Sequence, residues 1–63
     1  MQPTRQWNVT ARIAVGDLVS AEAGGLPVYR VLQLQDRRLW LREERTGRDH
    51  IAPADAMRWT LAQ

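Results

Sequence analysis

Cysteine, lysine and phenylalanine are absent from the sequence, and histidine occurs only once. Without cysteine, the chain can form neither disulfide bonds nor thiolate metal sites, which often support very small domains. No apolar run approaches the roughly 18 residues of a membrane span. Residues 1–12 contain no apolar segment of the signal-peptide type. We therefore expect a small bacterial, cytoplasmic protein with no membrane partner.

The chain is short: it has 63 residues, 44% of them hydrophobic, which is enough for one domain. A chain of this size buries about 60% of its unfolded surface, which is near the lower limit for a self-sufficient core. We therefore expect an efficient architecture, oligomerisation, or both.

All nine basic residues are arginines, and the net charge is +2. Arg5 and Arg12 lie in the first twelve residues, which contain no acidic residue. From residue 13 onward, seven arginines balance seven acidic residues. We interpret residues 1–12 as a mobile basic N-terminal arm and residues 13–63 as the folded barrel domain. Residues 8–13 form either a short strand or an arm that lies over the body.

Short apolar runs separated by turn signals predict an all-β domain of about five antiparallel strands. A β-bulge near Leu32 and Gln33 reconciles the two parities of apolar residues in the second strand. Gly47, at the third position of a short polar loop, is typical of a hairpin closed by a left-handed glycine. Pro53 followed by Ala-Asp-Ala predicts one short 3₁₀ turn. The predicted strands cover residues 18–22, 28–34, 39–43, 49–52 and 57–61.

This order of elements resembles the SH3-like small barrel over about three-quarters of the chain. Gly16-Asp17-Leu18-Val19 is similar to the opening of KOW and Tudor-type barrels, where a Gly-Asp pair starts the first strand. The hairpin around Gly47, followed by Ile51 and residues 53–57, is similar to their closing element. The resemblance implies an SH3-like barrel, a fold that serves many functions.

A narrower resemblance is to the type II, trimethoprim-resistant dihydrofolate reductases. These are SH3-like barrels of similar length that open with Gly-Asp-x-Val and close with Val-Gln-Ile-Tyr-Pro. The corresponding stretch here is residues 49–53, in which Ile51 and Pro53 match. His50 stands at the position of the pore-lining glutamine and Ala52 at that of the tyrosine. The resemblance implies an oligomeric pore with His50 and Ile51 among its lining residues.

Trp40 and Arg42 share the outward parity of one predicted strand, because Leu39 and Leu41 occupy the inward parity. An aromatic side chain flanked by guanidinium groups can stack on bases and pair with phosphates. The acidic residues interleaved with these arginines also allow a solvated hairpin with cross-strand ion pairs. The residues that we predict to bind a partner are Trp40, Arg38, Arg42, Arg45 and Arg48, with Trp7 and Arg5 of the arm in support.

The other two tryptophans and the histidine have alternative interpretations. Trp7 either packs against the barrel edge as a hydrophobic clasp or engages a partner through the arm. His50 is a half-exposed surface histidine or, because it titrates near neutrality, a ligand contact. Trp59 is expected in the core, and with Tyr29 it could otherwise form two walls of an aromatic cage.

The sequence contains no motif for nucleophilic catalysis, metal binding or a cofactor. The leading hypothesis is a small non-enzymatic module that binds protein or nucleic acid and needs no cofactor. One alternative is an oligomeric pore-type reductase like the family just described. The other is a structural protein whose Trp40 face is a homo-oligomer interface.

Overall fold

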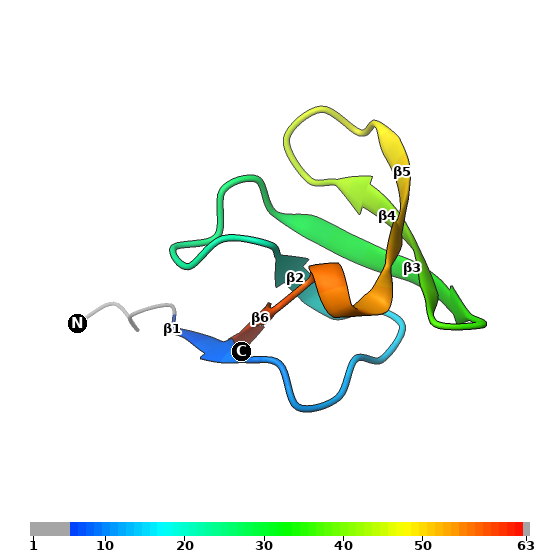
Figure 1. The fold of residues 1–63 in the computed structure, drawn as a ribbon. Helices are drawn as coiled ribbons and strands as arrows, with labels where there is room; N and C mark the ends of the chain where they lie inside the picture. The colour runs from blue at the N-terminus through cyan, green and yellow to red at the C-terminus, as the bar shows by residue number, and fades with distance from the viewer. Residues whose placement is uncertain (1–5, 63) are drawn as a thin grey trace.

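The computed structural model describes residues 6–62, which form six antiparallel strands and one 3₁₀ turn. The sheet order is β1-β6-β2-β3-β4-β5, and the sheet curls into a half-barrel whose end strands are β1 and β5 (Figure 1). The all-β class and the 3₁₀ turn are therefore confirmed. The elements are β1 (Gln6–Val9), β2 (Leu18–Ser20), β3 (Tyr29–Gln35), β4 (Arg38–Glu43), β5 (Asp49–Pro53), the turn η1 (Ala54–Ala56) and β6 (Trp59–Ala62).

The sixth strand, β1, comes from the segment that the charge pattern assigned to the arm. It pairs with β6 along its full length, from Gln6 opposite Ala62 to Val9 opposite Trp59. The indole of Trp7 lies over Gly25, at a place where any side chain on that glycine would overlap it. The division into an arm, residues 1–12, and a barrel domain, residues 13–63, stays a prediction, and so does the mobility of the arm.

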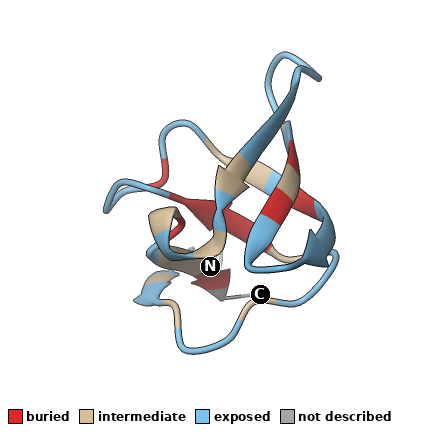
Figure 2. Ribbon diagram, turned by 45° about the vertical axis from the view of Figure 1, so that its right-hand side comes forward, coloured by how far each residue is buried: buried red, intermediate tan, exposed pale blue. Residues whose placement is uncertain are grey.

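The core fills the inner side of the curled sheet, as strand alternation requires. On β4 the predicted parity is confirmed, because Leu39 and Leu41 are fully buried while Arg38 and Arg42 are exposed (Figure 2). Trp59, expected in the core, is only partly buried. The buried cluster consists of Val19, Val31, Leu39, Leu41 and Met57.

The predicted β-bulge lies on β3. Val31 pairs with Leu41, but the next pair along the ladder is Gln33 with Trp40, so Leu32 is the extra residue. The bulge reverses the parity of the strand, and Leu34 therefore faces the inner side opposite Leu39. A bulge also bends its strand, which helps the short sheet to curl.

Two tight turns hold the β3–β4–β5 meander together. Asp36 and Arg37 both adopt positive φ angles, 53° and 62°, as a two-residue hairpin turn matching the strand twist requires. Gly47, at φ 74°, is the left-handed glycine predicted for the β4–β5 hairpin. Its N–H donates to the carbonyl oxygen of Glu43 at 2.8 Å.

Strand β2 ends two residues earlier than predicted because of Ser20. The Ser20 hydroxyl donates to the carbonyl oxygen of Pro27 at 2.9 Å and accepts from the N–H of Glu22 at 3.2 Å. Such local bonds favour a turn over continued pairing. Among residues 6–62, no helix is long and apolar enough to cross a membrane.

Candidate binding face

The outer side of the β3–β4–β5 meander carries a row of apolar side chains across three strands. Trp40 lies between Gln33 of β3 and Ile51 of β5 in the register of the sheet. Ile51 is 63% exposed, Leu32 at the bulge is 36% exposed, and Trp40 is partly buried. These three residues, which we call the apolar stripe, line a surface depression of about 400 Å³.

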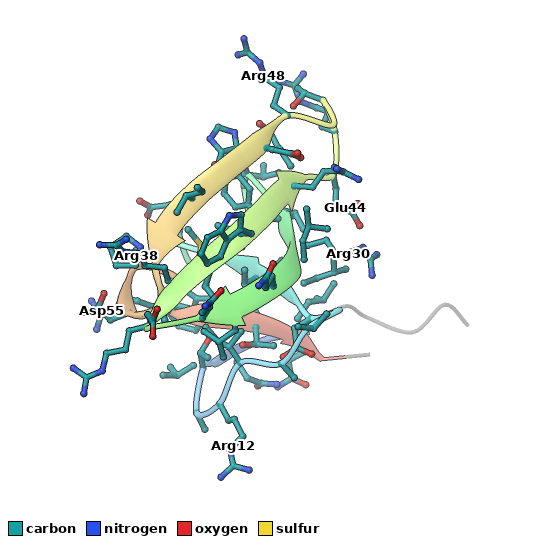
Figure 3. All side chains as sticks on the ribbon, turned by 90° about the vertical axis from the view of Figure 1, so that its right-hand side faces the viewer. Arg12, Arg30, Arg38, Glu44, Arg48 and Asp55 are labelled. Carbon is teal, nitrogen blue, oxygen red and sulfur yellow. The ribbon has the colours of Figure 1, made fainter. Side chains whose placement is uncertain are left out.

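Two arginines lie beside the stripe on β4, and two more lie in the loop that follows this strand. Arg38 and Arg42 flank Trp40 along β4, because residues two apart in a strand share a face. Arg45 and Arg48 lie in the β4–β5 loop at the tip of the hairpin. In Figure 3, the labelled Arg38 and Arg48 lie near opposite ends of this hairpin. The structure therefore places Arg38, Arg42 and Trp40 on one face, and Arg45 and Arg48 in the loop at the end of that face.

Two ion pairs occupy the carboxylates on this side of the sheet. Arg42 Nε and Nη2 donate to the two carboxylate oxygens of Asp49 at 2.8 and 3.3 Å. Arg30 donates to Glu44 at 2.8 Å, and these two residues lie together in Figure 3. Arg38 of this face, and Arg45 and Arg48 of the β4–β5 loop, form no ion pair with any residue of the described part.

The Arg42–Asp49 pair perturbs both groups. The hydrogen bond from Arg42 lowers the pKa of the Asp49 carboxyl below its ordinary value of 3.8. The same bond, with the charge of Asp49, raises the pKa of Arg42. Because both side chains are more than half exposed, solvent screens the pair and its contribution to stability is small. Its effect is to hold Arg42 against the hairpin.

Charge separates within the body of the molecule, although the body as a whole is neutral. The segment 29–53 contains six arginines and four acidic residues, whereas the segment 13–28 contains Asp17 and Glu22 and no arginine. Because residues 29–53 form the β3–β4–β5 meander, this excess of arginines lies in the same three strands as the apolar stripe.

Of the two supporting residues of the arm, Trp7 does not belong to this face. Trp7 lies on β1, at the other end of the sheet order from β5, and contacts Gly25. Its position is that of the hydrophobic clasp considered for it. Arg5 lies outside the described residues.

His50 and Ile51 point to opposite sides of β5, as adjacent strand residues do. His50 is opposite the inward-facing Leu41, and its ring meets the Tyr29 ring edge-on at a centroid distance of 5.4 Å. Ile51 is opposite Trp40 on the outer side. Within one chain, therefore, only Ile51 belongs to the apolar stripe.

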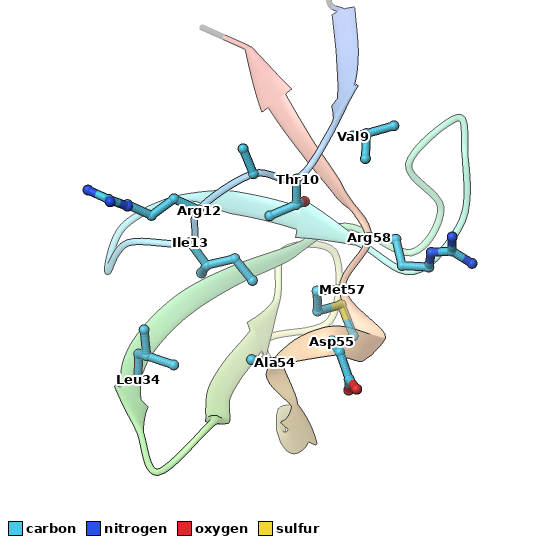
Figure 4. Close-up of a pocket in the computed structure, with 10 residues that line it drawn as sticks. Val9, Thr10, Arg12, Ile13, Leu34, Ala54, Asp55, Met57 and Arg58 are labelled. Atoms are coloured by element: carbon cyan, nitrogen blue, oxygen red, sulfur yellow. The ribbon is translucent and has the colours of Figure 1, made fainter.

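A second depression, of about 480 Å³, lies at the open mouth of the half-barrel (Figure 4). Ile13, Leu34 and Met57 give it an apolar lining, whereas Arg12 and Arg58 extend away from it in opposite directions. Sequence reasoning missed this pocket; the signal for it was the parity reversal that turns Leu34 inward. Its charged groups do not converge, so it offers a ligand little orientation.

Within residues 6–62, no three side chains of the metal-ligating types form a group that could hold a metal ion. Comparison of the chain with models of protein families, with curated proteins and with solved structures gives no match. The functional assignment therefore depends on the chemistry of the faces just described.

Proposed function

We propose that this protein is a non-enzymatic binding module whose partner-binding surface is the outer face of β3, β4 and β5. The observation that carries the proposal is the position of Trp40, central in the apolar stripe and flanked on its strand by Arg38 and Arg42. Protein interfaces have an apolar centre and a polar rim, and tryptophan and arginine dominate their binding energy. The face has this composition.

The chemistry of the stripe favours a protein partner. Trp40 has aliphatic neighbours, Leu32 and Ile51, whereas surfaces that bind single-stranded nucleic acid offer successive aromatic rings to successive bases. The rim is rich in arginine, which recognises carboxylates with two parallel hydrogen bonds. The expected partner is therefore a protein segment with apolar side chains bordered by aspartate or glutamate.

A random peptide library displayed on phage, selected on the immobilised protein, tests this proposal. Enriched peptides are expected to combine acidic and large apolar residues. They should lose about 10-fold or more in affinity for the variant with Trp40→Ala plus Arg42→Ala. The matched control removes an exposed apolar side chain and an arginine elsewhere, with Val15→Ala plus Arg12→Ala, and should bind normally. Peptides that bind the wild type and both variants equally would refute the proposal.

Nucleic acid is a second candidate partner, because Arg38, Arg45 and Arg48 form no ion pairs in the described part and the excess of arginines lies in the β3–β4–β5 meander. A labelled single-stranded oligonucleotide distinguishes the two. Binding that weakens steeply with salt and is lost in the variant with Trp40→Ala plus Arg42→Ala would favour nucleic acid. Absence of binding at low salt would remove this candidate.

We also propose that the half-barrel is of the SH3-like kind. The succession from β2 to β6, with η1 before the last strand, is the order on which that resemblance depends. Gly16 has φ 94° ahead of β2, and the Asp17 carboxylate accepts the N–H of Ala14 at 2.9 Å. Gly16 thus has a conformation that favours glycine, and the Asp17 side chain closes the turn. Both features support the similarity of this turn to the opening of KOW and Tudor-type barrels.

A pore-type reductase is the alternative function from the enzyme class, and it is favoured by the exposure of Ile51 on an end strand of the sheet. Residues that line a pore between subunits are exposed in the single chain. Titration with a reduced nicotinamide cofactor tests the idea directly. Saturable binding that is lost on His50→Ala would support it, and no binding would remove it.

A further inference from the structure

Among residues 6–62, strand β5 has one neighbour in the sheet, β4, and forms an open edge. In Figure 3 it lies at the outer side of the meander, with β4 between it and β3. Open edges offer unpaired backbone donors and acceptors to any second strand. The apolar stripe also runs up to this edge and ends at Ile51, its most exposed member.

The ladder between β4 and β5 determines which backbone groups are unpaired. It is bracketed by two bonds, from the N–H of Glu43 to the carbonyl of Arg48 and from the N–H of Ala54 to the carbonyl of Arg37. Because hydrogen-bonded and non-hydrogen-bonded pairs alternate in antiparallel sheets, even-numbered residues of β5 bond to β4. The residues whose backbone groups point to the open edge are Asp49, Ile51 and Pro53.

We propose that β5 pairs antiparallel with β5 of a second copy of this chain, about a twofold axis at Ile51. In this register, the two Ile51 residues exchange both of their backbone hydrogen bonds. The N–H of Asp49 donates to the carbonyl of Pro53 in the other copy. Pro53 has no N–H, and its position at the end of the strand confines that loss to the last rung.

The side chains are self-complementary in the same register. Asp49 lies opposite Pro53, and His50 lies opposite Ala52, so no like charges face each other across the new pair. The two Ile51 side chains meet on the outer face, and the two apolar stripes become one. A twofold interface requires such self-complementarity, and β5 has it in this register. The second copy is therefore the occupant of the edge that the sequence of β5 itself favours.

Charge supports the same register. Arg38 lies opposite Pro53 in the β4–β5 ladder, so Asp49 of the other copy lies two strand spacings away, about 10 Å. An extended arginine side chain spans most of this distance, and Arg38 forms no ion pair with the described residues of its own chain. The pairing therefore gives Arg38 a carboxylate partner, twice per dimer.

This inference does not rest on the proposed partner face, because it concerns the backbone edge of β5. It adds to that proposal: the dimer carries one binding face of six strands with twice the arginine rim. A pairing that stabilises the domain also fits a chain of this size, whose core alone supplies little stability.

Sedimentation velocity of the full chain from micromolar to millimolar concentration tests the proposal. The wild type is expected to dimerise. Ile51→Arg and Ile51→Glu each place like charges opposite each other at the axis and should weaken dimerisation about 10-fold or more. An equimolar mixture of the two variants should restore a heterodimer, because opposite charges then meet. Val15→Arg, a charge added at another residue that is 63% exposed, is the control and should dimerise like the wild type.

Circular dichroism verifies that each variant is folded, which is expected because the Ile51 side chain is mostly exposed. A wild type that stays monomeric at millimolar concentration would overturn the proposal. So would a dimer that tolerates Ile51→Arg, or a mixture of the two charged variants that stays monomeric. The mixing result requires residue 51 of one copy to lie close to residue 51 of the other, so dimerisation through a surface away from Ile51 does not produce it.

Discussion

Gly25→Ala is the substitution whose cost the structure predicts most directly. Gly25 has φ 76°, a conformation that costs an L-residue about 1–2 kcal/mol. In addition, a methyl group there overlaps the indole of Trp7. Because Trp7 is half-buried, displacing it should cost about half of a full Trp→Ala core loss, or about 2 kcal/mol. The total of about 3–4 kcal/mol approaches the whole stability expected for so small a domain.

Gly24→Ala provides the matched control. Gly24 has φ 100°, but an added methyl group meets nothing within 4 Å. It should therefore cost only the backbone penalty of about 1–2 kcal/mol. Urea unfolding followed by far-ultraviolet circular dichroism gives the free energy of unfolding of both variants. This signal reports the backbone and does not depend on tryptophan fluorescence.

A double-mutant cycle isolates the steric contribution. In a Trp7→Ala background, Gly25→Ala should cost no more than Gly24→Ala, which corresponds to a coupling of about 2 kcal/mol between Trp7 and Gly25. Equal penalties at the two glycines in the wild-type background would refute the reasoning. The same result would mean that β1 does not hold Trp7 against the loop, as a mobile arm would behave.

Three further outcomes follow from the core, the β2 turn and the hairpin ion pair. Leu39→Ala removes a fully buried side chain and should cost about 2–5 kcal/mol, leaving the chain largely unfolded by near-ultraviolet circular dichroism. Ser20→Ala leaves the Pro27 carbonyl without its donor and should lower the free energy of unfolding by about 1–3 kcal/mol in urea titrations. Because the folded pKa of Asp49 is below 3.8, its pair with Arg42 stabilises the fold above that pH and loses this effect as pH falls through the lower folded value. The difference in melting temperature between the wild type and Arg42→Gln should therefore disappear toward low pH, and a constant difference would contradict the assignment.

Local patterns in the sequence predicted most of the meander. The alternation around Trp40, the glycine of the β4–β5 hairpin, the bulge at Leu32 and the 3₁₀ turn after Pro53 are all confirmed. Each of these features depends on interactions between residues close in the chain. Such interactions can be predicted from the residue types and their spacing. The outward orientation of Trp40 and Arg42 followed from the same alternation.

Two kinds of feature were beyond such reasoning: contacts between distant segments, and backbone conformations that no residue type indicates. The pairing of β1 with β6 joins the two ends of the described chain, and no local pattern distinguishes this strand from a loose arm. The positive φ angles of Asp36 and Arg37 carry no glycine signal. The partner of Arg42 among several nearby carboxylates depended on the strand register, which only the folded sheet fixes.

The order of strands in the sheet also has a kinetic consequence. β3, β4 and β5 are consecutive in both sequence and space, whereas β1 and β6 meet only when the whole chain closes. Closing a short loop costs less entropy than closing a long one, so the meander is expected to nucleate folding. Folding φ-values should then be high for Leu39 and near zero for Trp7, and the reverse ranking would contradict this order. During synthesis, the residues of the β3–β4–β5 meander are all made before β6.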